Sequence, residues 1–374
     1  MQKKILLTAT VQSHIAQFHR PLIKILKEAG YEVHVAARNN LAEKNGLQIE
    51  HVDKIYDVPF QRSPLHPLNI RAFFIVRRII NEGGYDIISC NTPAGGVYTR
   101  LAATKARKNG TRVIYTAHGF HFYKGAPKTN WLIFYPIERA LARFTDTLIT
   151  ITKEDYCLAK PNFHTQVEHI YGVGADDKKF LSARREDVEA LRSDERYSGR
   201  FNILCTGELN ENKNQMVLID AMARLKETHP EAKLLLAGNG PSRPALEEAV
   251  EKYGLENNVE FLDYRPDVEK YVELCDLVVS MSLREGMPLN IIEASICKKP
   301  IVASFNRGHK ELISDRKTGL LVDPHSIDGI VDAITEMIEN PALREEMATR
   351  ANESLRRYWM TNIEDSLRRI YLKK

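Results

Sequence analysis

The strongest constraint on the fold is an alternation of short apolar runs with helical segments, which occurs twice along the chain. The runs of the first half are residues 3–11, 31–37, 85–90, 112–117 and 146–151. Those of the second half are residues 201–207, 232–238, 259–264, 276–281, 300–304 and 319–323. Short, continuous apolar runs suit parallel strands that helices cover on both faces. The pattern therefore predicts α/β architecture with two doubly wound domains.

The boundary between the two cycles lies in a polar, charge-rich stretch after Gly172. We predict an N-terminal domain over residues 1–172 and a C-terminal domain over residues 177–355, a division that suits a chain of 374 residues. The helical pattern at the chain end should break near 358–361, so that a last helix over about 358–374 crosses back to the first domain. Ligands bind outside the carboxyl ends of parallel strands, so we expect the two domains to face each other across a cleft that holds the site.

Cysteine usage and charge indicate where the chain works. Its five cysteines show neither disulfide pairing nor metal-ligand spacing, and no apolar run is long enough for a signal peptide or a membrane span. Residues 1–180 hold 25 Lys and Arg against 15 Asp and Glu, whereas the other 194 residues hold 28 against 34. We therefore expect a cytoplasmic protein, and one interpretation places it at the inner face of the cell membrane. We expect the basic half to bind an anionic partner.

Two glutamates bracket a predicted helix start in "SLREGMPLNIIEASI". Pro288 suits the first helical turn, and the free backbone amides around Gly286, Met287 and Leu289 would attract phosphate. Glu293, one turn further along, can accept hydrogen bonds from hydroxyls, and Glu285 can face a group on the other side of that phosphate. The pattern favours a nucleotide sugar as ligand. The alternative is that Glu285 only complements the helix dipole and Glu293 is a surface acid.

In the residues around these two glutamates and in several other motifs, the chain resembles the retaining glycosyltransferases of family 4. These enzymes have the two-domain GT-B fold with Rossmann-like domains. The glutamate pair in "EGMPLNIIEA" is similar to the signature of that family, and the resemblance covers essentially the whole chain. The motifs "QRSPLHPLN", "TRVIYTAHGFHFYKGAP", "ITKEDY" and "GELNENKNQ" look most like bacterial enzymes of exopolysaccharide and capsular polysaccharide assembly.

The resemblance implies roles for the donor-side residues. Glu285 would hold hydroxyls of the donor sugar, Glu293 would hold the ribose hydroxyls, and Lys213, in the loop that begins at Gly207, would reach the phosphates. The family commonly has an arginine where this chain has Glu208, which puts the usual pair of cations in doubt. Either Arg284 or Arg265 supplies the missing charge, or Glu208 turns away and pairs with another side chain.

Further positions carry over by the same resemblance. Gly238 and Gly240 permit a close backbone approach near the nucleotide, although a plain strand-to-helix turn explains them equally well. Tyr264 and Arg265 would supply backbone contacts to the base. On the first domain His118 would contact the donor sugar near its reacting end, and the acceptor-side candidates are His14, Phe18 and His121.

We find no Asp-x-Asp motif and no His or Cys cluster that would hold a metal, so we expect no metal and no other cofactor. The resemblance implies a retaining transfer in which the leaving diphosphate takes the proton of the acceptor. The expected function is transfer of a hexosyl or N-acetylhexosaminyl group from a UDP-sugar to a polyprenyl-diphosphate-linked saccharide, with no nucleic acid as partner. A non-catalytic binding protein of the same fold and a nucleotide-sugar epimerase remain alternatives. A dehydrogenase would need a Gly-x-Gly-x-x-Gly turn after the first strand, and "TATVQSHIAQF" has none.

Two segments of the basic half mix arginines with aromatic and aliphatic residues at helical spacing, namely residues 71–80 and 130–144. They could lie in the interface of an anionic bilayer. They could equally be helices that pack on the sheet with a charged outer face.

Overall fold

The computed structural model describes residues 2–42, 47–63, 66–172 and 174–372. Pro64 and Leu65 of the "QRSPLHPLN" motif, and the chain ends of the predicted domains, lie outside this range. The chain divides into two compact units, each described here by itself: Met1–Val173 together with Ile363–Lys374, and Gly174–Asn362.

The first unit is built on a parallel sheet with the order β3-β2-β1-β4-β5-β6-β7. Its strands are β1 (Lys4–Val11), β2 (Glu32–Arg38), β3 (Lys54–Asp57), β4 (Ile87–Asn91), β5 (Arg112–Ala117), β6 (Thr147–Thr150) and β7 (Gln166–His169). Its helices are α1 (Gln12–Phe18), α2 (Arg20–Glu28), α3 (Leu68–Gly83), α4 (Pro93–Ala102), α5 (Thr104–Lys108), α6 (Lys128–Leu141), η1 (Ala142–Phe144) and α7 (Lys153–Asn162). The chain doubles back between β1 and β4, so the loops after these strands meet at a topological switch point.

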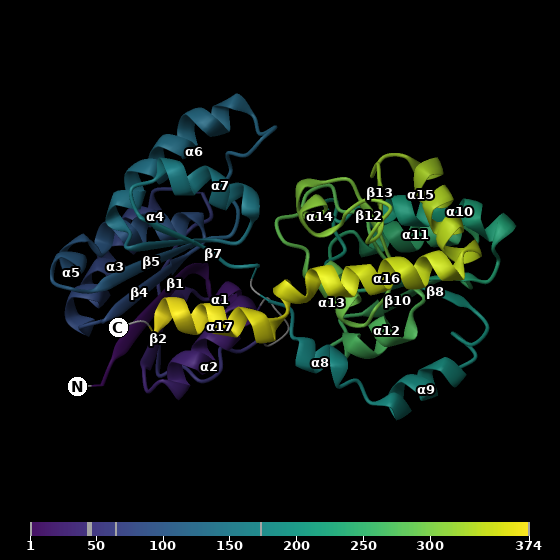
Figure 1. The fold of residues 1–374 in the computed structure, drawn as a ribbon, viewed down its shortest axis with the longest axis horizontal. Coiled ribbons are helices and arrows are strands. Elements are labelled where there is room, and N and C mark those ends of the chain that lie inside the picture. The colour runs from purple at the N-terminus through teal and green to yellow at the C-terminus, as the bar shows by residue number, and fades with distance from the viewer. Residues whose placement is uncertain (1, 43–46, 64–65, 173, 373–374) are drawn as a thin grey trace. The chain divides into compact units, whose positions relative to one another are not determined.

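Helices cover both faces of this sheet (Figure 1). Ile88 and Cys90 of β4 pack against α3 and α4 in one hydrophobic cluster. Ser89 lies between them and therefore points to the opposite face, where its hydroxyl meets the Tyr371 hydroxyl of the C-terminal helix α17 (Met360–Tyr371) at 2.8 Å. Arg368 of α17 also pairs with Glu28 of α2 at 2.5 Å. The end of the chain is thus part of the first unit.

The second unit repeats the plan with the order β10-β9-β8-β11-β12-β13. Its strands are β8 (Phe201–Thr206), β9 (Ala232–Ala237), β10 (Val259–Asp263), β11 (Leu277–Ser280), β12 (Ile301–Ser304) and β13 (Leu320–Val322). Its helices are α8 (Asp177–Leu181), α9 (Arg185–Ser193), α10 (Gln215–Thr228), α11 (Arg243–Tyr253), α12 (Val268–Leu274), α13 (Leu289–Ile296), α14 (Arg307–Leu312), α15 (Ile327–Glu339), α16 (Pro341–Leu355) and η2 (Arg356–Tyr358). The switch point lies between β8 and β11, which pair in parallel.

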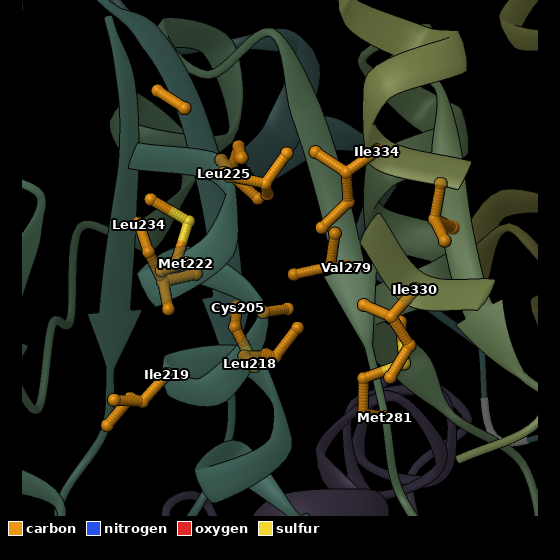
Figure 2. Packing of buried hydrophobic residues seen from close by; sticks show 14 of the residues in the cluster. Cys205, Leu218, Ile219, Met222, Leu225, Leu234, Val279, Met281, Ile330 and Ile334 are labelled. Carbon is orange, nitrogen blue, oxygen red and sulfur yellow. The ribbon is translucent and has the colours of Figure 1, made fainter. Parts of the chain in front are cut away.

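Figure 2 shows the core on one face of this sheet. Leu218, Met222 and Leu225 of α10 lie one turn apart. Leu218 and Leu225 point toward Ile330 and Ile334 of α15, whereas Met222 points toward Leu234 of β9. The three residues of α10 are four and three positions apart, which is the spacing that places apolar side chains on one face of an amphipathic helix.

The second unit extends beyond the predicted limits of 177 and 355. Ala175 pairs with Trp359 in an isolated bridge, and the Asp177 carboxylate accepts hydrogen bonds from the backbone and the hydroxyl of Thr361. These contacts hold η2 and the first turn of α17 in the second unit, so only residues from Ile363 onward belong to the first.

Every predicted strand is present, but two strands of the first sheet escaped prediction. They are β3 and β7, the two edges of the sheet, whose side chains are mostly exposed or half-buried. An edge strand with polar side chains lacks the continuous apolar run on which the prediction rested. In the described part of the chain no helix is both long enough and apolar enough to span a bilayer.

Candidate functional site

The candidate donor site is built from two loops at the switch point of the second sheet. One loop follows β8 and carries Gly207 to Asn214, and the other follows β11 and carries Met281 to Pro288. Because β8 and β11 are paired neighbours with parallel direction, both loops leave the same edge of the sheet side by side.

Lys213 of the first loop and Glu285 of the second form an ion pair. Lys213 Nζ donates to Glu285 Oε1 at 2.6 Å, and the two side chains are 24% and 14% exposed. A mostly buried, charge-assisted bond of this length orients both groups. The site therefore presents a cation and an anion in contact, with the remaining carboxylate oxygen and the other ammonium protons available to a ligand.

Asparagines of the "NENKN" segment hold this pair in place. Asn212 Nδ2 donates to the Arg284 carbonyl at 3.0 Å, and the Asn212 carbonyl accepts from Leu283 N at 2.7 Å. The Asn210 side chain accepts from Lys213 N at 3.0 Å. The two bonds of Asn212 tie the loops together, and the bond of Asn210 fixes the backbone at Lys213 within its own loop.

Glu208 does not pair with Lys213. Its carboxylate accepts from Asn210 Nδ2 at 3.1 Å, which directs the charge back into its own loop. Of the two candidates for the missing cation, Arg265 forms a two-pronged pair with Asp267 at 2.9 Å, so its charge is already matched. Arg284 is exposed and adjoins Glu285 in the chain.

The helix start after Glu285 differs from the prediction by one residue. Pro288 is the N-cap, with extended backbone at φ −75° and ψ 106°, and α13 begins at Leu289. Pro288 is buried, Met287 and Leu289 are half-buried and Gly286 is exposed. Asn290, in the first turn, has a buried Nδ2 without a hydrogen-bond partner among the described residues. An unsatisfied donor there adds to the free backbone amides of the helix start.

Glu293 stands in the next turn of α13 and is half-buried. Burial raises the pKa of this carboxyl to about 7, while Lys179 and Lys213 act in the opposite direction. Since the pKa lies near neutrality, modest changes in pH or in bound ligand change its charge. Glu293 is therefore not the solvated surface acid of the alternative interpretation.

The glycines of this region serve close backbone packing between loops. A Cβ atom on Gly238 would lie 1.9 Å from the Gly207 carbonyl oxygen, and one on Gly240 would lie 2.2 Å from that of Leu209. Gly207 and Gly238 also have φ of 142° and 151°, which favours glycine. The close approach predicted for Gly238 and Gly240 is thus made to the neighbouring loop of the protein. Tyr264, in the turn after β10, has a side chain that is 59% exposed.

In the first unit His118 follows β5 directly, and its ring meets residues of the first helix. His118 Nε2 and His14 Nε2 lie 3.2 Å apart, and the His14 ring contacts Phe18 with centroids 5.0 Å apart. Burial is the main cause that lowers the pKa of His14 well below its usual value and the pKa of His118 to about 4. Both rings are accordingly neutral at pH 7.

His121 is not part of this group. Its side chain is exposed and its ring packs on Phe134 of α6 with centroids 4.8 Å apart. The structure thus brings together three of the four first-domain candidates, and separates His121 from them.

The sequence reasoning missed several residues at these positions. Asn290 stands inside the glutamate motif but carries no charge to draw attention. Gly308 of α14 is far away in sequence, yet a Cβ atom there would lie 2.7 Å from Glu285 Cβ. His19 joins His14 and His118 in a group of three imidazoles, which the search for a histidine cluster overlooked because two members are 104 residues apart.

Comparison with known proteins identifies relatives along the whole chain. The family described as "Glycosyl transferases group 1" matches residues 187–354, and that described as "Glycosyl transferase 4-like" matches residues 4–152. EpsD of Bacillus subtilis, named as a glycosyltransferase, is 37% identical over 99% of this chain and 97% of its own length. The UDP-Gal:alpha-D-GlcNAc-diphosphoundecaprenol alpha-1,3-galactosyltransferase of Escherichia coli is 25% identical over 74% of this chain and 72% of its own length.

Among solved structures, HepE of Anabaena in complex with UDP and glucose has a similar fold. The TM-score is 0.78 at 23% identity, over 98% of this chain and 99% of that one. At this level of identity the likeness concerns the fold.

Proposed function

This chain belongs to the family 4 glycosyltransferases and has their GT-B fold, and from that premise we propose that it is a retaining enzyme that uses a UDP-sugar. The sugar is a hexosyl or N-acetylhexosaminyl group, and the acceptor is a saccharide carried on a polyprenyl diphosphate. The product enters extracellular or capsular polysaccharide assembly. EpsD, which matches nearly the full chain, and the Escherichia coli enzyme, whose name specifies a UDP-sugar and a diphosphoundecaprenol acceptor, support this choice.

The observation that carries the proposal is the Lys213–Glu285 pair beside the start of α13. A diphosphate at this helix start would accept hydrogen bonds from free amides and from Asn290 Nδ2. Lys213 would then contact the phosphate that departs, where negative charge grows as the bond to the sugar breaks.

Glu285 would have two tasks in this arrangement. One carboxylate oxygen holds Lys213, and the other is free to accept a hydrogen bond from a hydroxyl of the donor sugar. Glu293, further along α13, would accept hydrogen bonds from the ribose hydroxyls. The ammonium thus lies between the sugar-binding carboxylate and the phosphates.

We propose that transfer needs no divalent metal at the diphosphate. In the described residues the loops that carry Lys213 and Glu285 hold no set of three His, Cys, Asp or Glu side chains able to share an ion. Lysine and helix amides would neutralise the leaving charge, and an oxygen of the leaving diphosphate would take the proton of the acceptor hydroxyl. The protein then contributes position and electrostatic stabilisation.

The membrane-bound acceptor would be met by an apolar and basic surface of the first unit. Ile70 and Phe74 of α3 are 59% and 60% exposed, and with Arg71 and Arg78 they line a shallow depression. On α6 the exposed large apolar residues are Leu132, at 76%, Ile133, at 51%, and Ile137, at 41%. Exposed aliphatic and aromatic side chains next to arginines suit the interface of an anionic bilayer at the inner face of the cell membrane.

The test of this function is turnover of UDP-sugars with an undecaprenyl-diphosphate-linked saccharide, in buffer with excess EDTA. Transfer of the sugar with its anomeric configuration retained is the expected result. Isomerisation of the sugar without an acceptor would indicate an epimerase, and tight UDP-sugar binding without any turnover would indicate a binding protein. Loss of turnover in EDTA that Mg²⁺ or Mn²⁺ restores would contradict the metal-free step.

A further inference from the structure

Three histidines of the first unit converge from separate segments of the chain. His14 belongs to α1, His19 lies between α1 and α2, and His118 follows β5. One ring nitrogen from each lies within 4.8 Å of the other two. The His14 and His118 rings meet edge to face with centroids 4.6 Å apart, and the His19 ring lies 5.4 Å and 6.0 Å from them.

His14 and His118 lie within hydrogen-bonding distance of each other, but that pair does not account for the buried position of His19. His19 is 6% exposed, and its Nε2 has no hydrogen-bond partner in the part of the chain that the structure describes. Leaving a buried polar atom unpaired typically costs about 1–3 kcal/mol. A bound ligand that this nitrogen can reach would offset the cost.

We propose that His14, His19 and His118 form a binding site for a Zn²⁺-class transition-metal ion. Zinc is bound by histidine nitrogens at about 2.0–2.1 Å in tetrahedral sites, which sets neighbouring nitrogens roughly 3.3 Å apart. The separation of 3.2 Å between His14 Nε2 and His118 Nε2 fits this geometry. Small rotations of the rings would bring the third nitrogen from the present limit of 4.8 Å to the ion.

The ligand set selects the ion by its chemistry. Imidazole suits Zn²⁺, Ni²⁺ and Cu²⁺, whereas Mg²⁺ and Ca²⁺ prefer oxygen. Three protein ligands leave a fourth position open, and because His14 and His118 are only half-buried, water or an anion can reach it. Binding requires that the proton now shared between the two Nε2 atoms move to the other nitrogen of its ring.

Occupation of the site would remove His118 from the transfer reaction. The family resemblance implies that His118 contacts the donor sugar in the proposed transfer, so a zinc ion on its ring would inhibit turnover. This consequence rests on the proposed function, whereas binding of the ion does not.

Titration of the tag-free full-length protein with ZnCl₂ in a calorimeter tests the site. We expect one ion per chain, and His19→Gln should weaken binding by at least about tenfold, the smallest loss usually seen even for an outer-shell partner of a metal. His34→Gln is the matched control, because His34 is also buried in the first unit but both of its ring nitrogens are engaged, with Tyr85 and Glu32. This control should bind zinc as the unaltered protein does.

Two outcomes would overturn the site: no zinc bound, or equal binding by His19→Gln and the unaltered protein. If His19→Gln fails to fold in a melting experiment, His14→Gln provides the same comparison of zinc affinity. A protein that binds one zinc ion in the titration but transfers no sugar in excess EDTA, where the site holds no zinc, would retain this site and refute the proposed function. The two claims therefore fail separately.

Discussion

Lys213 Nζ donates to Glu285 Oε1 at 2.6 Å, joining the two loops that leave neighbouring strands at the switch point of the second sheet. The lysine thus has an acid beside it, and that acid is the one expected to hold the sugar. Glu208, which stands where the family commonly has an arginine, accepts a hydrogen bond from Asn210 and does not pair with this lysine. A change at either member of the pair consequently alters the other.

We predict that Lys213→Ala lowers turnover far more than it weakens donor binding. If Lys213 stabilises charge that develops only as the sugar departs, its loss should reduce kcat by about 10² to 10³, the usual effect of removing one preorganised electrostatic donor. Lys213→Arg should recover only part of the rate, because the planar guanidinium of arginine does not reproduce the compact ammonium of lysine. Steady-state kinetics and calorimetric donor affinities measure the two quantities separately.

Lys233→Ala is the matched control for that prediction. Lys233 pairs with Glu260 at 2.7 Å in the same unit, so its loss should lower the melting temperature and leave turnover unchanged. The same behaviour from Lys213→Ala, a fully active but less stable protein, would reduce the Lys213–Glu285 bond to a structural ion pair.

Substitution of Glu285 and of Glu293 should have different effects on the affinity for free UDP. Glu293→Ala removes the proposed ribose contact and should weaken UDP binding, whereas Glu285→Ala removes a contact to the sugar and should spare UDP while impairing the intact donor. Calorimetric titration of both variants with UDP and with UDP-sugar decides the matter. Equal loss of UDP affinity in both variants would refute this division of roles.

Much of the architecture could be predicted from the sequence, because buried parallel strands produce continuous apolar runs. The strands β3 and β7 could not, since edge strands such as Gln166–His169 bury too little to show that pattern. The chain-end helix could be expected near residue 358, but the exact boundary depends on Asp177 binding Thr361 from 184 residues away.

The site was predictable as far as its residues belong to local motifs. Glu285, Glu293 and Lys213 were named as candidates from such motifs. The bond between Lys213 and Glu285 was not predicted, because it depends on β8 lying beside β11. The same limit hid His19 and Gly308, which reach their neighbours only through the tertiary fold. Local motifs identify the side chains able to bind a ligand, whereas the order of the strands determines which of these side chains contact each other.

Glu293 should make folding stability depend on pH around neutrality. Its folded pKa of about 7 exceeds the usual glutamate value of 4.5 because burial disfavours the carboxylate. Ionisation therefore costs folding free energy, and this cost appears as pH rises from 4.5 and is complete above 7. Glu293→Gln, which cannot ionise, should melt at a higher temperature than the unaltered protein at pH 8, and the difference should shrink toward pH 5. Melting curves across this range measure the effect, with Glu346→Gln as control because Glu346 of α16 is exposed. A difference that is independent of pH would contradict the raised pKa.

Gly308→Ala should disturb the site without altering any group that bears charge. The added Cβ would lie 2.7 Å from Glu285 Cβ and 2.8 Å from its carbonyl oxygen, so the backbone at Glu285 or at residue 308 must shift. We expect this shift to weaken the bond between Glu285 and Lys213. Overpacking of this kind typically costs about 1–3 kcal/mol of stability, and we expect turnover to fall because Glu285 no longer orients the lysine or the sugar.

Gly329→Ala is the matched control, since Gly329 also lies in the first turn of a helix of the second unit and its Cβ would meet only the Ser326 side chain, at 3.1 Å. Kinetics and melting curves of the two variants provide the comparison, and a Gly308→Ala enzyme as active as Gly329→Ala would show that the position of Glu285 is not critical for transfer.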